Sequence, residues 1–224
     1  MPRPWTLVER VQTPEGPLTL LRSGQGFLIK IGDRVLMSSA LQRSEVEVAR
    51  LGCAPIADRP RARVLIGGLG LGYTLRAALD SLRPDAVVEV AELNPVVVDW
   101  CRGPVAALAG DTLADPRVEV YAGDVTDRIR QVALDPRAPR LDAIVLDLYL
   151  GPAAHRSRGE DPLYGPAALG EALAALSPDG VYAVWGEERD RTFEHRLARV
   201  GFRQVRFVDA DGGGPRHAVV IARR

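Results

Sequence analysis

The 224-residue sequence predicts an α/β fold, an open and mostly parallel sheet with helices between its strands. Three observations predict it. Short apolar runs recur along the chain and alternate with helix or turn signals. A glycine-rich turn follows the first of these runs directly, and acidic residues follow three later ones. Because parallel strands end at the same edge of a sheet, these glycines and acids are expected to meet there.

The glycine turn follows an apolar strand expected at residues 64–66. It contains Gly68, Gly70 and Gly72, and a helix is expected directly after it, over residues 73–82. Glycine has no Cβ, so backbone N–H groups in such a turn can come within contact distance of a ligand. Taken alone, the turn fits sites for NAD, FAD or S-adenosylmethionine (SAM), and also some turns that bind nothing.

Three acids at strand ends make a nucleoside site the better interpretation. The strands are expected at residues 86–91, 117–121 and 141–146, and the acids are Glu92, Asp124 and Asp147. Glu92 lies about 20 residues beyond the glycines, where an acid accepts hydrogen bonds from ribose hydroxyls. It could also cap the helix expected near Pro95, a role that Asn94 could fill as well. Asp124 suits the amino group of an adenine.

The length of the chain bears on the cofactor. A dinucleotide fold needs a second mononucleotide-binding half and a substrate domain, and 224 residues leave little room for both. The sequence therefore favours a cofactor with a single nucleoside.

The chain resembles class I SAM-dependent transferases and, among them, the spermidine synthase (polyamine aminopropyltransferase) family. The match covers about residues 18–200, and its most specific parts are the end of the glycine turn at residues 72–76 and the Glu-Leu-Asn-Pro run at residues 92–95. Residues 120–124, 142–147, 151–152, 163–164 and 176–181 also fit. The resemblance implies a Rossmann-like seven-stranded SAM-dependent methyltransferase sheet with a small N-terminal β extension. It also implies a homodimer.

The departures from this family concern the acceptor side of the site. Gly70 stands where the family has an aspartate that faces the aminopropyl end of decarboxylated SAM, and Leu150 replaces a second acid after the fourth strand. Val48 and Ala49 stand where a Tyr-His pair is expected. An aspartate at position 70 would repel the carboxylate of intact SAM, so its loss favours intact SAM and methyl transfer to a small, amine-containing or other acceptor. Two alternatives remain open: aminopropyl transfer from decarboxylated SAM, and a SAM-fold protein that binds without turnover.

Roles can be assigned to individual residues within this interpretation. The predicted cofactor-binding residues are Gly68, Gly70, Gly72, Glu92, Leu93, Asp124, Val125 and Asp147. Asp147 and Tyr149 are the predicted catalytic residues, and Asp147 is expected to hold or deprotonate the acceptor amine. Tyr149 is expected to orient the acceptor or to offer a π face to a cation.

The remaining pattern predicts the flanking elements. A small antiparallel sheet or hairpin is expected within residues 18–36, helices at 44–51 and 163–176, and strands at 181–185, 202–208 and 217–222, the last two joined across residues 211–214. We expect residues 1–55 to form an N-terminal β-hairpin and helix extension, and residues 56–224 to form the SAM-binding Rossmann-like catalytic domain. Residues 151–162 are interpreted either as a lid over the substrate or as a solvated loop.

Composition narrows the partners. The formal net charge is zero and the pI is about 6.8, which argues against nucleic acid and favours a small-molecule acceptor. Two cysteines and no signal peptide predict reduced thiols in a cytoplasmic protein. No apolar run is as long as a membrane span, and the three histidines are scattered, so neither a membrane nor a metal site is expected.

Overall fold

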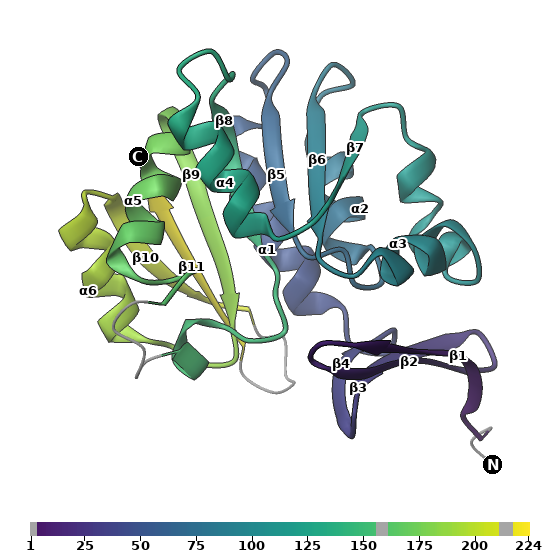
Figure 1. Ribbon diagram of the computed structural model, residues 1–224. Helices are drawn as coiled ribbons and strands as arrows, with labels where there is room; N and C mark the ends of the chain where they lie inside the picture. Colours follow the sequence, from purple (N-terminus) through teal and green to yellow (C-terminus); the bar gives the residue numbers. More distant parts are fainter. Residues whose placement is uncertain (1–3, 156–160, 211–216) are drawn as a thin grey trace.

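Seven strands form the main sheet of the structure, a computed structural model that describes residues 4–155, 161–210 and 217–224 (Figure 1). Their order across the sheet is β10-β11-β9-β8-β5-β6-β7. Neighbours among β5 to β9 are parallel, and β11 is antiparallel to both β9 and β10. The bounds are β5 Arg63–Gly67, β6 Val87–Glu92, β7 Val118–Ala122, β8 Leu141–Leu146, β9 Leu176–Gly186, β10 Arg203–Asp209 and β11 Ala218–Arg223. The predicted seven-stranded α/β sheet is confirmed.

Helices cover both faces of this sheet (Figure 1). One face packs against α1 Arg43–Cys53, α2 Tyr73–Ser81 and α3 Pro95–Arg102. The other packs against α4 Val125–Leu134, α5 Pro166–Ala175 and α6 Arg191–Val200. Short 3-10 turns lie at Ala54–Ile56, Ala106–Ala109, Thr112–Ala114 and Pro152–His155. Among the residues that the structure describes, no helix is long and apolar enough to cross a lipid bilayer.

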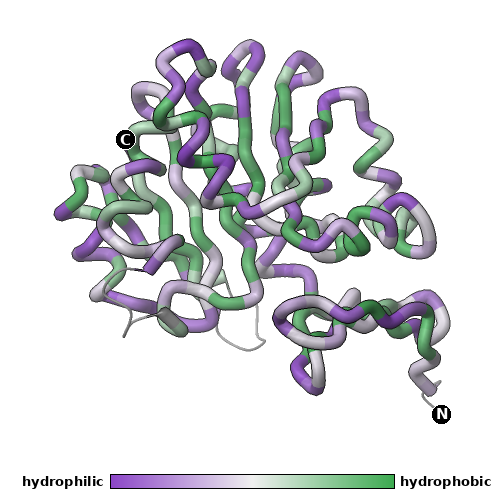
Figure 2. Tube along the Cα trace, viewed as in Figure 1, coloured by the Kyte–Doolittle hydropathy of each residue, from purple (hydrophilic) through white to green (hydrophobic). Residues whose placement is uncertain are grey.

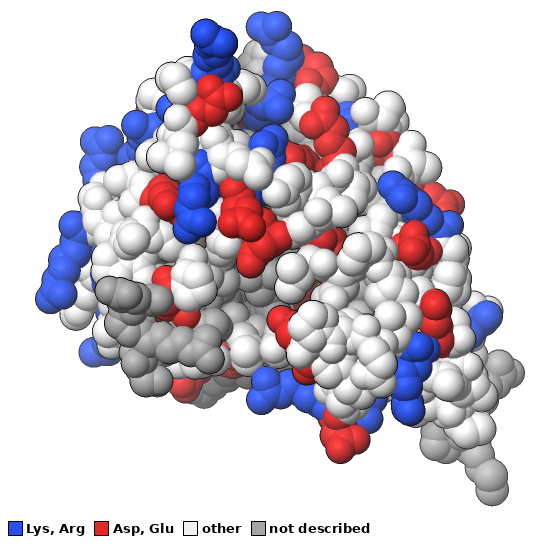
Figure 3. Space-filling view, in the orientation of Figure 1, with Lys and Arg blue, Asp and Glu red and all other residues white. Residues whose placement is uncertain are grey.

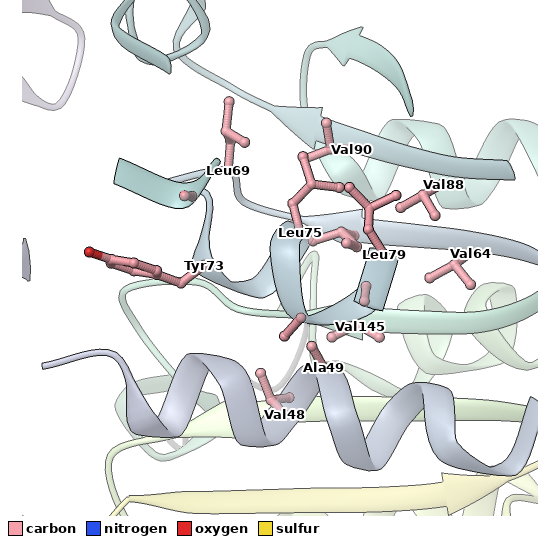
Figure 4. Close-up of a cluster of buried hydrophobic side chains, with 14 of the residues drawn as sticks. Val48, Ala49, Val64, Leu69, Tyr73, Leu75, Leu79, Val88, Val90 and Val145 are labelled. Atoms are coloured by element: carbon pink, nitrogen blue, oxygen red, sulfur yellow. The ribbon is translucent and has the colours of Figure 1, made fainter. Parts of the chain in front are cut away.

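The strands of the main sheet are apolar because helices bury both of their faces, as the green strands of Figure 2 show. In β5, Val64 and Ile66 face the α1–α2 side and Leu65 faces the α4–α5 side. On the α2 side, Leu75 and Leu79 point toward the strands (Figure 4). The glycine turn follows the last residue of β5 and therefore leaves the sheet at the carboxyl ends of the parallel strands.

A second, antiparallel sheet precedes the main one. It has four strands in the order β1-β2-β3-β4, with bounds β1 Thr6–Thr13, β2 Gly16–Ser23, β3 Gly26–Ile31 and β4 Arg34–Ser38. The β structure expected over residues 18–36 is therefore only part of an extension that begins at Thr6. β1 is an exposed edge strand, so its Glu9 and Arg10 are compatible with a strand although they break the apolar pattern.

The small sheet lies beneath the carboxyl edge of the main sheet (Figure 1). Its buried residues Leu18, Leu20, Phe27 and Ile29 belong to the same apolar cluster as α1 and α2. The indole N–H of Trp100 on α3 donates to the Glu9 carboxylate at 2.7 Å. The sulfur of Met37 on β4 accepts from the Leu71 N–H at 2.9 Å. The N-terminal sheet is therefore fastened directly over the glycine turn.

Several boundaries differ from those expected. α4 lies where no helix is predicted from sequence, and β9 begins at Leu176, five residues before the expected strand. The turn expected at residues 211–214 lies outside the described residues. The division of the chain at residue 55 stays a prediction, and α1, which precedes that division, packs against α2, β8 and β9.

Candidate functional site

The three glycines of the turn have left-handed backbones, with φ of 87° at Gly68, 52° at Gly70 and 86° at Gly72. A Cβ on Gly68 would lie 2.5 Å from the carbonyl oxygen of Asp147, which is immovable backbone. A Cβ on Gly70 would lie 2.5 Å from the sulfur of Met37. Gly68 thus brings the ends of β5 and β8 together, and Gly70 leaves room for a side chain of the N-terminal sheet.

A cavity of about 550 Å³ opens between the glycine turn, the ends of β6, β7 and β8, and the N-terminal sheet. The predicted residues that line it are Gly68, Gly70, Glu92, Leu93, Asp124, Val125, Asp147 and Tyr149. Gly72 does not line it, because its N–H turns back to the Leu69 carbonyl at 2.8 Å and starts α2. The structure therefore gathers the predicted site residues around one pocket, with Gly72 behind it.

Glu92 is the last residue of β6 and is 7% exposed. Its carboxylate accepts from the N–H groups of Leu69 at 3.0 Å and Asn94 at 2.8 Å, so it joins the glycine turn to the start of α3. Burial raises the pKa of Glu92 above its usual value, although these N–H bonds act in the opposite direction. Each carboxylate oxygen can accept more than one hydrogen bond, which leaves capacity for ribose hydroxyls.

Asp124 follows β7 and caps α4. Its carboxylate accepts from the backbone N–H of Thr126 at 2.8 Å and from its hydroxyl at 2.9 Å. The neighbouring apolar positions are Val125, which is buried, and Leu93 from the previous strand end, which is half exposed. Together they offer an acceptor and apolar walls to a flat heterocycle.

Asp147 lies one residue beyond β8, is half-buried and lines the pocket. The hydroxyl of Thr74 on α2 donates to its Oδ2. Burial, and then the nearby charge of Glu45, raise the pKa of Asp147 to about 7, while the Thr74 bond opposes them. A carboxylate that titrates near neutral pH is suited to accept a proton from a substrate.

Glu45 is a lining residue that the sequence did not single out. It lies in the first turn of α1, and the Ser44 hydroxyl donates to its carboxylate at 2.7 Å. The Thr74 hydroxyl, which binds Asp147, also lies 3.4 Å from the Glu45 carbonyl oxygen. The polar run at residues 42–47 was the available signal, but only the fold brings it to Asp147.

The residues at which the sequence departs from the resembled family on the acceptor side lie in different parts of the structure. Val48 and Ala49 point into the core beneath α2 and do not line the cavity (Figure 4). Leu150 does line it, and Tyr149 is exposed at its edge. An aromatic side chain that the sequence did not indicate, Trp185 at the end of β9, completes this side.

The charge of the pocket is of one sign. Its charged lining residues, among those described, are five acids and no Lys, Arg or His: Glu15, Glu45, Glu92, Asp124 and Asp147. Figure 3 shows acidic side chains where the main body meets the N-terminal sheet. Such a pocket favours a cationic ligand.

The segment after β8 is described only in part. The Gly151 N–H donates to the Glu187 carboxylate at 3.1 Å, and buried Asp161 accepts from Leu163 and Tyr164 N–H groups at 2.9 and 2.7 Å. Residues 156–160 lie outside the described residues, so the lid interpretation stays a prediction. Across the described ranges, no three His, Cys, Asp or Glu side chains are grouped to hold a metal ion.

No family model matches the chain. Three curated relatives, all polyamine aminopropyltransferases, are similar to it: two from strains of Mycobacterium tuberculosis and one from Mycobacterium bovis. Each is 29% identical over 129 residues, which is 58% of this chain and 23% of the relative. The chain thus spans less than a quarter of the length of these relatives.

Solved structures match over more of the chain. A spermidine synthase in complex with the transition-state analogue AdoDATO has a TM-score of 0.74, and the spermidine synthase from Thermotoga maritima has 0.73. Both are 18% identical, and both matches cover 97% of this chain and 72% of the other.

The expected methyltransferase activity is wrong, because the similar proteins are aminopropyltransferases. Two features of the site explain the error. The carboxylate of intact SAM would enter a pocket whose described charged residues are all acidic. Gly70, on which the expectation rested, is in close contact with Met37, so its lack of a side chain has a packing reason as well. The chain has the fold seen in these spermidine synthase structures.

Proposed function

We propose that this protein transfers an aminopropyl group from decarboxylated SAM to an amine acceptor. The observation that carries the proposal is the set of five acids, with no basic residue, among the described charged residues of the pocket. Decarboxylated SAM carries a sulfonium and an ammonium group and no carboxylate, so it complements this charge. Opposite charges about 4 Å apart attract by roughly 4 kcal/mol at the effective dielectric of a partly buried site.

The cofactor-side residues fit the nucleoside of decarboxylated SAM. Glu92 would accept from the ribose hydroxyls and Asp124 from the adenine amino group, with Leu93 and Val125 against the faces of the base. Gly68 has no side chain, so a ligand can lie close to the backbone at the end of β5. When bound, decarboxylated SAM supplies an electrophilic carbon next to its sulfonium.

The acceptor nitrogen attacks that carbon in line. The N–C bond forms as the C–S bond breaks, and the electron pair of the broken bond stays on sulfur, which becomes a neutral thioether. The nitrogen loses one proton, and Asp147 accepts it. With a pKa of about 7, Asp147 is partly ionised at neutral pH and can take this proton. Holding the nitrogen in line with the C–S bond supplies much of the acceleration.

The experiment is an assay of the purified protein with decarboxylated SAM and putrescine, with 5′-methylthioadenosine and the aminopropylated amine measured by mass spectrometry. We expect both products in equal amounts. Asp147→Asn should lower their rate of formation at least 100-fold, and the matched variant Asp135→Asn, at an exposed acid outside the pocket, should not. Binding of decarboxylated SAM without product from any amine would instead support a binding protein without turnover.

A further inference from the structure

We propose that the preferred acceptor is a primary amine with an apolar chain, a monoalkylamine, and that the N-terminal sheet holds this chain. This inference rests on the proposed aminopropyl transfer and names its substrate class. The observation behind it is one wall of the pocket, which consists of five aliphatic or thioether side chains: Leu18, Ile29, Ile31, Leu36 and Met37.

The wall follows from the pairing of the N-terminal strands. Leu18 on β2 pairs with Ile31 on β3, and Ile29 pairs with Met37 on β4, so these side chains share one face of the sheet. The opposite face carries the Lys30–Val35 pair, and Val35 is 52% exposed. The face toward the pocket is thus selectively apolar, while the outer face is of mixed polarity and carries the exposed Val35.

The opposite side of the pocket is also apolar near the site of transfer. Leu148, Leu150 and Leu163 line it together with Trp185. A chain of CH₂ groups between these two walls would lose water on both sides, and each buried CH₂ favours binding roughly fourfold.

The acids nearest the proposed site of proton transfer are Asp147 and Glu45. Asp147 and Glu45 both line the cavity, and the charge of Glu45 acts on Asp147, so two acids lie near the place where the acceptor nitrogen must react. A short diamine has a second ammonium that needs its own counter-charge away from that place. The remaining acid of the N-terminal part is Glu15, an exposed residue in the turn between β1 and β2. A second ammonium against the aliphatic wall would be desolvated without a partner, which is unfavourable.

The test compares amines of matched length with decarboxylated SAM as donor: butylamine with putrescine, and hexylamine with 1,6-diaminohexane. We expect kcat/KM to rise roughly 15-fold from butylamine to hexylamine, the gain for two CH₂ groups. Hexylamine should exceed 1,6-diaminohexane at least tenfold. Faster transfer to the diamines would overturn this inference and leave the proposed aminopropyl transfer standing.

A binding measurement separates this inference from the proposed aminopropyl transfer. Calorimetric titration of hexylamine and of 1,6-diaminohexane into the protein saturated with 5′-methylthioadenosine gives the Kd of each amine without turnover. Tighter binding of hexylamine with no transfer to any amine would support this inference and refute aminopropyl transfer. Equal or weaker binding of hexylamine would refute this inference.

Variants of β3 and β4 test whether the N-terminal sheet causes this preference. Leu36→Asn should lower kcat/KM for hexylamine about tenfold and leave the Kd of decarboxylated SAM unchanged. Val35→Asn, next to it but on the exposed face, is the matched control and should change neither. Ile31→Thr, which keeps the β-branched shape, is the second variant should Leu36→Asn fail to fold. Equal loss for hexylamine and 1,6-diaminohexane in both pocket variants would contradict the inference.

Discussion

Asp147 is the residue on which the proposed chemistry depends. Asp147→Asn keeps the shape of the side chain and removes its ability to take a proton. We expect kcat to fall by about 10² or more, with the Kd of decarboxylated SAM within a few-fold of wild type. In the wild type, kcat/KM should rise as pH increases through about 7, because the base must be ionised. A flat pH profile from 5 to 9 would remove Asp147 from the proton transfer.

The same residue affects folding stability. Its pKa is raised by burial and by Glu45, so the folded state holds this proton more tightly than the unfolded chain does. The resulting stability is present below the unfolded pKa and is lost as pH rises through about 7. Asp147→Asn should therefore stabilise the free protein at pH 8, by at most about 4 kcal/mol because the site opens to solvent, and far less at pH 4. Urea unfolding at both pH values measures the difference, and an equal effect at both would contradict it.

Gly70 and Met37 form a coupled pair. An aspartate at position 70 tolerates the left-handed backbone, but its Cβ would lie 2.5 Å from the Met37 sulfur. We expect Gly70→Asp to destabilise the protein by about 1–3 kcal/mol. Met37→Ala should make room for it, so that the double variant recovers part of this loss.

The same variants should also differ in their affinity for decarboxylated SAM. The double variant should bind decarboxylated SAM about tenfold more tightly than Met37→Ala alone, because the new carboxylate adds a counter-charge for the ammonium. Chemical unfolding and calorimetry of the four proteins complete the cycle. Strictly additive effects on stability would show that Met37 does not determine the residue at position 70.

At the scale of elements, Asp124 serves a helix and a ligand at once. Asp124→Ala should cost about 1 kcal/mol by loss of the α4 cap and should also weaken nucleoside binding. Asp124→Ser keeps a capping oxygen but removes the carboxylate, so it should keep stability and still bind 5′-methylthioadenosine about tenfold more weakly.

Asp190 provides the control for that experiment. It caps α6 through the Thr192 and Phe193 N–H groups at 2.9 and 3.3 Å and does not line the pocket. Asp190→Ala should lower stability and leave nucleoside affinity unchanged. If Asp124→Ser bound 5′-methylthioadenosine as tightly as wild type, Asp124 would be a cap and no more.

The elements differ in how far the sequence could predict them. β5, β6 and β8 are buried on both faces, and their apolar runs end at a glycine or an acid, so they were predictable. β1 is exposed and carries Glu9, whose partner is Trp100 on a distant helix, so no local pattern marks it as a strand. α4 has only three buried residues among ten, which leaves a weak apolar stripe.

At the scale of the whole molecule, long-range contacts set the limit of the sequence argument for the site. The strand-end acids could be placed together because parallel strands share an edge. Met37 of the N-terminal sheet contacts Gly70 in the turn that follows β5 of the main sheet. Ile29 and Ile31 of the N-terminal sheet likewise line the cavity at the edge of the main sheet. The sequence alone therefore suggested that the glycine at position 70 reflects a change of cofactor. In the structure, Met37 of the N-terminal sheet occupies the space that a side chain at position 70 would need.

The expected homodimer is a prediction about the outer surface of the N-terminal sheet. Its exposed large apolar residues include Trp5, Leu7 and Val8 at an edge strand, which is the kind of surface that a second copy covers. We expect a dimer in light scattering coupled to gel filtration, and Leu7→Asp should shift it to monomer. Leu134→Asp is the control, because Leu134 is 72% exposed at the end of α4 in the main body, away from this edge. A wild-type monomer at all concentrations would contradict the prediction, and the patch would then face a different partner, such as a further part of a longer chain like those of the curated relatives.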